Sequence, residues 1–297
     1  MKYNINGTQY DFIKNFQNND ELRNSLNLLS KKIFAGLSFE NWYQQGFWKE
    51  KCIPYSLFDG HTCVANIFAS IFNVTVQNEK KLYIQLGTVM TAFDYRGKGL
   101  SRFLMQEIFR DWQSNCDAIY LYANDSVVNF YPKFGFIEEY EYRYNTTLSP
   151  KNGSICKLNI ENDADKKILL EKIQYSNPFS SVKMLNSIEF IMFHCIMFQK
   201  DNLYFLSEYD AVVVAKQDGE TLFCFDIFCK EDNNFDDILS IAANKNCRKA
   251  FLGFTPKATH HWESLLSQEE DTHLFVLRDK ENIFKNNKLI LPMLCRT

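Results

Sequence analysis

The sequence predicts an α/β protein of two domains, each built on a mixed β-sheet flanked by helices. The chain has 297 residues, of which 46% are hydrophobic and 15% aromatic, enough to fill two ordinary cores. Helical and strand-like patterns follow one another twice along the chain. Between the two runs lies a polar, turn-forming stretch, SPKNGS at 149–154. We therefore expect one domain over residues 1–150 and a second, slightly smaller one over 151–297.

The first half opens with a predicted amphipathic helix and continues with a meander of strands. Leucines recur at helical spacing over residues 20–34, with Asp20 as a plausible cap. From Cys52 to Thr91 the texture is of β type, broken by the turn pair Asp59-Gly60 and again near Asn78. This pattern predicts three strands.

After the third strand the first half alternates between helix and strand. Two glycines precede a helix that we expect to end near Trp112. A strand over 118–124, a short helix over 126–135 ended by Gly135, and a last strand over 136–145 complete this half.

The second half repeats the order of elements of the first. We expect strands at 154–160, 203–208, 211–217, 221–229, 249–254 and 273–277, and helices at 162–174, 182–198, 235–245 and 260–268. Because this order matches that of the first half, we interpret it as an internal repeat with little residue identity. The alternative is that unrelated α/β domains produce similar strings.

Charge and cysteine usage exclude several classes of protein. The 33 basic and 36 acidic residues give a net charge of −3, which offers no broad attraction for nucleic acid or an anionic membrane. Nine cysteines are scattered without paired metal-ligand spacing. The amino terminus has no signal-like pattern, and the most apolar stretch, 190–198, is too short to span a bilayer. We expect a cytoplasmic protein with reduced thiols and no metal.

The sharpest local feature is the segment from Gly87 to Met105, where a strand passes into a helix through RGKG at 96–99. Unpaired N–H groups at a helix start bind phosphate, and glycines let a pyrophosphate approach the backbone. Lys98 lies between the glycines, which excludes a Walker loop, and Arg102 stands where a dinucleotide fingerprint needs Gly or Ala. A plain glycine turn that caps the helix is the alternative.

A second feature, YANDSVVNFYPKFGF at 122–136, gives the first a family context. YRGKGLS after a V-x-T strand, followed some thirty residues later by NDSVVNFYPKFGF, resembles the GNAT acetyltransferase superfamily over about residues 20–145. The resemblance, to the bacterial two-domain type, implies a mostly antiparallel sheet in each half. It also implies acetyl-CoA as co-substrate.

The resemblance also implies roles for individual residues. Val89 to Thr91 would form the splayed strand that pairs with pantetheine and polarises the thioester carbonyl. Tyr131 would protonate the departing thiolate, or would be a buried aromatic only; Asn124 would bind the pantetheine arm, or only cap a helix. The cofactor-binding residues implied are Val89, Met90, Thr91, Arg96, Gly97, Lys98, Gly99, Leu100, Ser101 and Asn124, and the catalytic residue is Tyr131.

The sequence departs from the family where a general base is often found. The strand before the glycine loop carries no carboxylate, and Gln85 cannot accept a proton. Holding an alkyl amine of pKa ~10.4 neutral at pH 7 costs roughly 4.6 kcal/mol, so a base matters. Candidates elsewhere are Glu141 and the α-carboxylate of Thr297. Adjacent histidines at 260–261 point apart on a helix and do not suggest a metal.

The second copy is predicted to be inactive, because the stretch equivalent to the glycine loop, IFCKEDNNFDDI at 227–238, is acidic and lacks glycine. We expect N-acetyl transfer from acetyl-CoA to a small-molecule or peptide amine, by direct attack through a tetrahedral intermediate. A non-catalytic acyl-CoA-binding or sensing protein and a structural scaffold are the alternatives. A homo-oligomer is left open beside a monomer.

Overall fold

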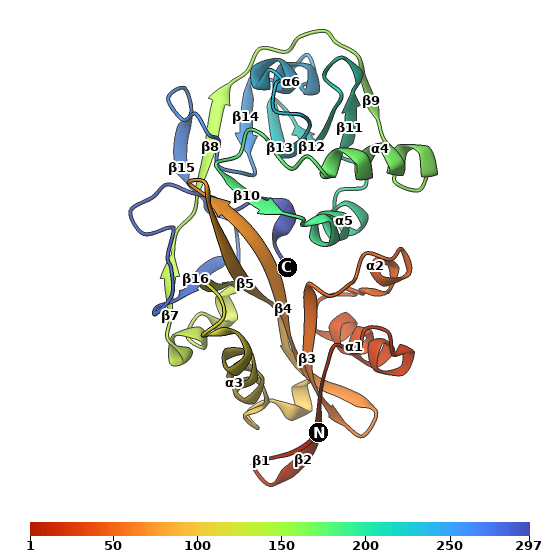
Figure 1. Ribbon diagram of the computed structural model, residues 1–297, viewed down its shortest axis with the longest axis vertical. Coiled ribbons are helices and arrows are strands. Elements are labelled where there is room, and N and C mark those ends of the chain that lie inside the picture. Colours follow the sequence, from red (N-terminus) through yellow and green to blue (C-terminus); the bar gives the residue numbers. More distant parts are fainter.

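Two sheets stacked along the long axis form the molecule, and the last residue lies between them (Figure 1). The computed structural model describes every residue from 1 to 297. Red to yellow segments make up most of the lower lobe and green to blue segments most of the upper one. The fold is therefore built from two units in sequence order, with one exchange described below.

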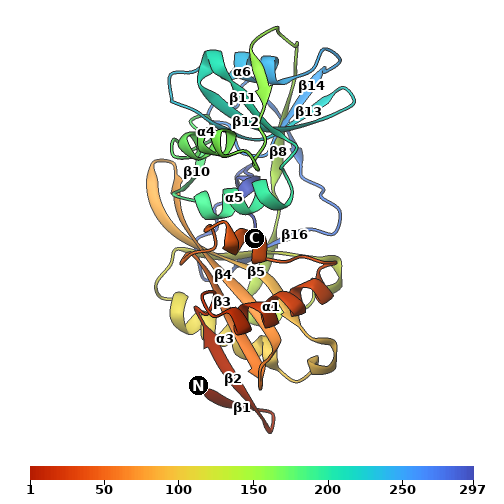
Figure 2. The same cartoon turned by 90° about the vertical axis from the view of Figure 1, so that its right-hand side faces the viewer.

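The first sheet has nine strands in the order β1-β2-β3-β4-β5-β6-β16-β7, with β10 alongside β4. Its only parallel pair is β5 with β6. Helices α1 and α2 pack on one face and α3 on the other, as Figure 2 shows for α1 and α3. The elements are β1 (Lys2–Ile5), β2 (Thr8–Lys14), α1 (Asp20–Ile33), α2 (Glu40–Gln44), β3 (Cys52–Asp59), β4 (Thr62–Val76), β5 (Glu79–Thr91), α3 (Leu100–Trp112), β6 (Ala118–Ala123), β7 (Phe136–Glu139), β10 (Val182–Leu185) and β16 (His273–Leu277).

The second sheet has seven strands in the order β15-β8-β14-β13-β12-β11-β9, and its only parallel pair is β13 with β14. The elements are β8 (Tyr142–Thr147), β9 (Ile155–Lys157), α4 (Asp163–Ile173), α5 (Ile188–Met197), β11 (Leu203–Leu206), β12 (Ala211–Asp218), β13 (Thr221–Phe228), α6 (Phe235–Ala242), β14 (Lys249–Leu252) and β15 (Glu263–Leu266).

The two sheets share one topology. From β2 onward the first runs β2-β3-β4-β5-β6-β16-β7, and the second runs β9-β11-β12-β13-β14-β8-β15, position for position. Each has its parallel pair in the same place, and each has a register shift between its third and fourth strands in this order. The predicted fold class, a mixed and mostly antiparallel sheet flanked by helices in both halves, is confirmed.

The halves exchange one strand each, which the sequence did not indicate. The predicted last strand, 136–145, breaks at Tyr140 and Glu141, so that β7 stays in the first sheet while β8 joins the second. In return β16, from the end of the chain, lies between β6 and β7. The boundary near residue 150 stays a prediction, but a cut there would remove one inner strand from each sheet.

Three local expectations are wrong, each because tertiary pairing outweighs a helical pattern. Residues 260–268 contain the strand β15 (Glu263–Leu266) instead of a helix, since those four residues pair with β8. The first part of the expected helix 182–198 is β10, whose alternating burial fits the end of β4. The short helix over 126–135 is two 3-10 turns, Asp125–Val127 and Tyr131–Phe134. Gly135 ends the second turn with a φ of 90°, as expected for a C-cap glycine.

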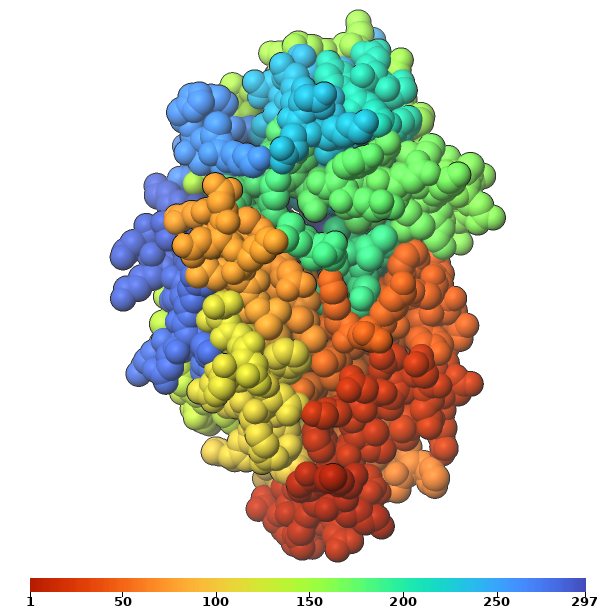
Figure 3. Space-filling model, viewed as in Figure 1, coloured from red at the N-terminus to blue at the C-terminus, as the bar shows by residue number.

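The two lobes share a core at their junction. The long β4–β5 hairpin reaches the second half, where β4 pairs with β10. On the surface, its orange tip lies against green and blue segments of that half (Figure 3). Helix α5 lies in this junction, and Phe190, Met192 and Cys195 are fully buried. Most of the apolar stretch 190–198 is thus core, as expected, although Phe198 at its end is 54% exposed. No helix is long and apolar enough to cross a membrane.

Candidate functional site

The site is organised by two parallel strands that separate partway along their length. Strands β5 and β6 pair only from Tyr83 with Ala118 to Leu86 with Leu121. On its other side β5 has a register shift against β4, which leaves Thr88 and Val89 outside the ladder. Thr88 also has a φ of 44°, which a non-glycine residue seldom adopts. The backbone just before the glycine loop is therefore free to bind an extended ligand.

The residues predicted on this splayed strand lie where β5 approaches the helix. Met90 is buried in the core on the α1 side, whereas Val89 packs on the α3 side. Thr91 shares a hydrogen bond between its hydroxyl and that of Ser101, 2.8 Å apart, which ties the end of β5 to the first turn of α3. The structure thus brings Val89, Thr91 and Ser101 to one edge.

The glycine loop leaves the start of α3 open. Gly97 and Gly99 have φ values of 75° and 82°, so both need the left-handed region that glycine tolerates. Gly99 is the N-cap of α3 and supplies no side-chain cap, and the first turn contains no acidic residue. A Cβ at Gly97 would meet no atom within 4 Å. The space beside Gly97 is thus open, at the positive end of the helix dipole.

Basic side chains surround this opening. Arg96 and Lys98 are exposed and stack on Phe93 and Tyr95, with 4.2 Å and 4.6 Å from charge to ring centroid. Leu100 is buried and anchors the helix to the core. The residues fit a pyrophosphate, because they combine free backbone donors, positive side chains and space.

Asn124 and Tyr131 follow β6, and Tyr131 belongs to the core on the α3 side of the sheet. Asn124 is exposed, and its Oδ1 accepts a hydrogen bond from Ser126 at 2.7 Å, without capping the turn that follows. Tyr131 is 4% exposed and packs against Phe136 and Phe275. Its hydroxyl has no protein partner. Burial raises the pKa of Tyr131 to about 12, so the phenol stays protonated at neutral pH.

On the opposite face of β5, the end of the chain lies against the splay. Gln85 Nε2 donates to the main-chain oxygen of Thr297 at 3.1 Å. A Cβ at Gly87 would lie 2.6 Å from the same oxygen, so only glycine leaves room for Thr297 there. From the sequence, Gln85 cannot serve as the general base and Thr297 is a candidate for it. The sequence does not indicate that Gln85 and Thr297 are in contact, or that Gly87 makes room for Thr297.

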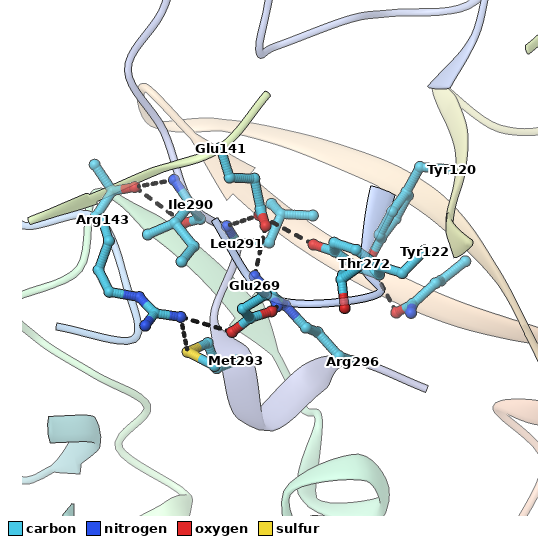
Figure 4. A network of polar contacts seen from close by, with 12 residues as sticks. Tyr120, Tyr122, Glu141, Arg143, Glu269, Thr272, Ile290, Leu291, Met293 and Arg296 are labelled. Carbon is cyan, nitrogen blue, oxygen red and sulfur yellow. Dashed lines mark hydrogen bonds and ion pairs between the residues drawn. The ribbon is translucent and has the colours of Figure 1, made fainter. Parts of the chain in front are cut away.

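A half-buried ion-pair network surrounds Arg296, the residue before Thr297 (Figure 4). Arg296 bonds Glu141 and Glu269, each at 2.5 Å, and Arg143 bonds Glu269 at 2.6 Å. The main-chain oxygen of Arg296 accepts a hydrogen bond from His194 Nε2 at 2.5 Å. Burial lowers the pKa of His194 to about 4, so its ring is a neutral donor. The sequence contained no signal for Arg296 or His194, which meet only in three dimensions.

Glu141 is poorly placed to act as a base. It is 7% exposed, and burial raises its pKa above the usual value. Its Oε1 accepts hydrogen bonds from Tyr122 and from the Leu291 N–H, while Oε2 bonds Arg296. Both carboxylate oxygens of Glu141 thus already have partners in the protein, which leaves Thr297 as the sequence candidate that lies at the splay.

A cavity of about 340 Å³ opens beside this network, lined by Tyr122 and by the loop between β15 and β16. His273, which lines it, lies 2.8 Å from Asp125 and 2.7 Å from Glu138, and its hydrogen bond to the Glu138 carboxylate is the main cause that raises the pKa of His273. Its carboxylates are Asp125, Glu138, Glu139, Glu141, Glu269 and Asp271.

The second sheet offers no equivalent opening. The side chain of Asn234 caps α6 by accepting from the Asp237 N–H at 3.1 Å, and Asp236 and Asp237 occupy the first turn. Where β13 and β14 would separate, the Gly253 N–H donates to the Cys224 oxygen and the Met293 N–H to the Gly253 oxygen. A segment near the end of the chain thus fills that gap. The inactivity of the second copy stays a prediction.

Comparisons with known proteins agree with this geometry. Residues 30–138 match the family model described as acetyltransferase (GNAT) domain. No curated protein sequence matches the chain.

Three solved structures share the fold over most of the chain. A conserved protein of Enterococcus faecalis V583, described as a probable N-acyltransferase, is 13% identical with a TM-score of 0.58, covering 91% of this chain and 73% of its own. A GCN5-related N-acetyltransferase from Anabaena variabilis is 11% identical with a TM-score of 0.54, covering 89% and 72%. Eis1 from Mycobacterium abscessus is 10% identical with a TM-score of 0.53, covering 92% and 74%. At these identities the likeness concerns the fold alone.

Proposed function

Because residues 30–138 match the GNAT acetyltransferase domain, we propose that the chain transfers an acetyl group from acetyl-CoA to an amine. The observation that carries the proposal is the open start of α3 beside a splayed β5–β6 pair. Pyrophosphate would bind the N–H groups of residues 97–101, assisted by Arg96 and Lys98. The pantetheine arm would lie along Val89 to Thr91 and reach Asn124.

The acyl group would then lie in the splay, with Tyr131 on one side. The backbone at Val89, which is outside the β4 ladder, is suited to donate to the thioester oxygen as charge develops there. Attack of the amine gives a tetrahedral intermediate; its collapse breaks the C–S bond. Tyr131 would give its proton to the thiolate sulfur, because its phenol is protonated and its hydroxyl has no protein partner.

The amine must lose a proton before or during attack. A candidate general base for this proton lies on the opposite face of β5. In the 297-residue chain, the α-carboxylate at Thr297 lies beside Gln85 and Gly87. It would accept the proton from the attacking amine, directly or through water. The carboxylate-lined cavity nearby favours a protonated amine as the incoming acceptor, whether a small molecule or a peptide, since negative charge raises its local concentration.

A second function, binding or sensing of acyl-CoA without turnover, is favoured by one observation. The side chain of β5 that faces the splay next to Thr297 is Gln85, which is not a base. A protein that binds acyl-CoA without catalysing transfer would keep the glycine loop and would need no general base.

The two functions separate in one experiment. The purified 297-residue chain is incubated with acetyl-CoA and a panel of polyamines, aminoglycosides and peptides, and release of free CoA thiol is followed. We expect thiol release that depends on the acceptor. The control is Gly97→Val, which leaves the core intact but blocks the loop. CoA binding without thiol release for any amine would favour the sensing function, and no CoA binding would refute both.

A further inference from the structure

The turn of the amino-terminal hairpin touches the glycine loop. Strands β1 and β2 are joined by Asn6 and Gly7, both with positive φ, of 50° and 87°. The turn is closed by a hydrogen bond within the hairpin, in which the Oδ1 of Asn4 accepts from the Gly7 N–H at 2.9 Å. The side chain of Asn6 is not needed for this turn and points away from it.

That side chain instead reaches across to the loop. Asn6 Nδ2 donates to the main-chain oxygen of Lys98 at 2.9 Å. A Cβ at Gly99 would lie 3.1 Å from the same nitrogen, so Asn6 is in close contact with the peptide unit that joins Lys98 to Gly99. This unit contributes the N–H of Gly99, which is the N-cap of α3.

In a trans peptide the C=O and N–H of one unit point in opposite directions, and the chain contains no cis bond. A donor that fixes the Lys98 oxygen therefore aims the Gly99 N–H to the far side. Glycines at 97 and 99 allow this unit to rotate at little steric cost, because neither carries a Cβ. Without an anchor the loop could turn its oxygen, rather than its N–H, toward an anion.

We infer that Asn6 is a positioning residue for the pyrophosphate loop, acting through the Lys98–Gly99 peptide unit. This inference rests on the proposed binding of acetyl-CoA at residues 96–101. It assigns the amino-terminal hairpin, which lies outside the residues that match the GNAT model, to the same site. Asn6 would not touch the ligand; it would hold the N–H that does.

The hairpin stays docked without this bond, which makes the inference testable. Tyr3 and Phe12 pack edge-on against Phe103 of α3, with centroids 4.9 Å and 5.6 Å away. Asn6→Gly removes the donor and keeps the positive φ. Asn6→Asp keeps the shape but can only accept, so it would repel the Lys98 oxygen. Asn4→Ala is the matched control, because it breaks the bond within the hairpin and leaves the loop contact.

Affinities of these variants are measured by calorimetry for CoA and for S-acetyl-pantetheine, which has no pyrophosphate. We expect the Kd for CoA to rise about threefold to fivefold in Asn6→Gly, the effect of losing one exposed hydrogen bond. A larger rise is expected in Asn6→Asp, and none in Asn4→Ala. The Kd for S-acetyl-pantetheine should not change in any of them.

Two results would overturn the inference alone: equal CoA affinity in wild type and both Asn6 variants, or equal losses for CoA and S-acetyl-pantetheine, which would indicate a general structural effect. Absence of CoA binding by the wild-type chain would instead overturn the proposed function, and this inference with it.

Discussion

Replacing Gly87 with alanine tests whether Thr297 acts at the splay. The new Cβ would lie 2.6 Å from the Thr297 oxygen, whereas ordinary contact begins at 3.4 Å, so the chain end must move by 3.4 − 2.6 = 0.8 Å. Gly87 does not have a positive φ, so alanine adds no backbone strain. A displacement near 1 Å can cost on the order of 100-fold in rate. We expect kcat to fall about 10- to 100-fold.

The assay follows release of CoA thiol at saturating acetyl-CoA, with CoA affinity measured in parallel. Affinity should stay the same, since the glycine loop is untouched. A chain extended by one glycine after Thr297, which converts the α-carboxylate to an amide, should lose at least as much rate. Because both changes act on one group, combining them should cost little more than the extension alone. Unchanged kcat in Gly87→Ala, or full additivity, would refute this reasoning.

Three further predictions concern the loop, the acid and a buried carboxyl. Gly97→Val should abolish CoA binding without loss of cooperative unfolding, because its side chain would enter the open space before α3; unchanged affinity would sink the site. Tyr131→Phe should lower kcat about 10- to 100-fold at unchanged CoA affinity; equal kcat would reduce Tyr131 to packing. Burial raises the pKa of Asp226 to about 7, above its unfolded value, so wild-type stability should fall as pH rises from about 4 to about 7. Asp226→Asn keeps an Oδ1 for Asn177 and the Ile227 N–H, so in urea unfolding it should gain stability over wild type across that window; a pH-independent difference would contradict this.

Helix α1, the strands β3 to β5 and helix α3 could be read from the sequence because their patterns and their packing agree, whereas the β1–β2 hairpin and α2 were not predicted. The α1 helix begins one residue after its true cap, Asn19, whose Oδ1 accepts from the Leu22 N–H at 3.1 Å, whereas the sequence suggested Asp20. The meander β3–β5 and helix α3 lie within a residue or two of expectation. In these segments the apolar spacing and the turn residues favour one structure only.

The strand exchange could not be predicted, since it depends on pairing between segments far apart in sequence. Residues 136–145 have a continuous β-type pattern, and only the third dimension divides them between two sheets. Residues 263–266 form a strand in spite of their helical pattern, because they pair with the edge of β8. Neither choice changes the local composition that a sequence pattern can detect.

The candidate site divides in the same way. The glycine loop, Asn124 and Tyr131 belong to short local motifs, and the structure brings them to one end of the β5–β6 pair. The opposite face depends on Thr297, which contacts Gln85 over a separation of 212 residues. Arg296 forms ion pairs with Glu141 and Glu269 from two other segments. No pattern in the sequence marks these contacts.

Titration of the whole chain with CoA tests the central claim most directly. The open loop at 96–101 and the self-capped start of α6 predict one site per chain. That site should disappear in Gly97→Val. It should survive in Asp236→Gly, which changes only the first turn of α6 in the second half. A stoichiometry of two, or a single site that is lost in Asp236→Gly and kept in Gly97→Val, would contradict the account.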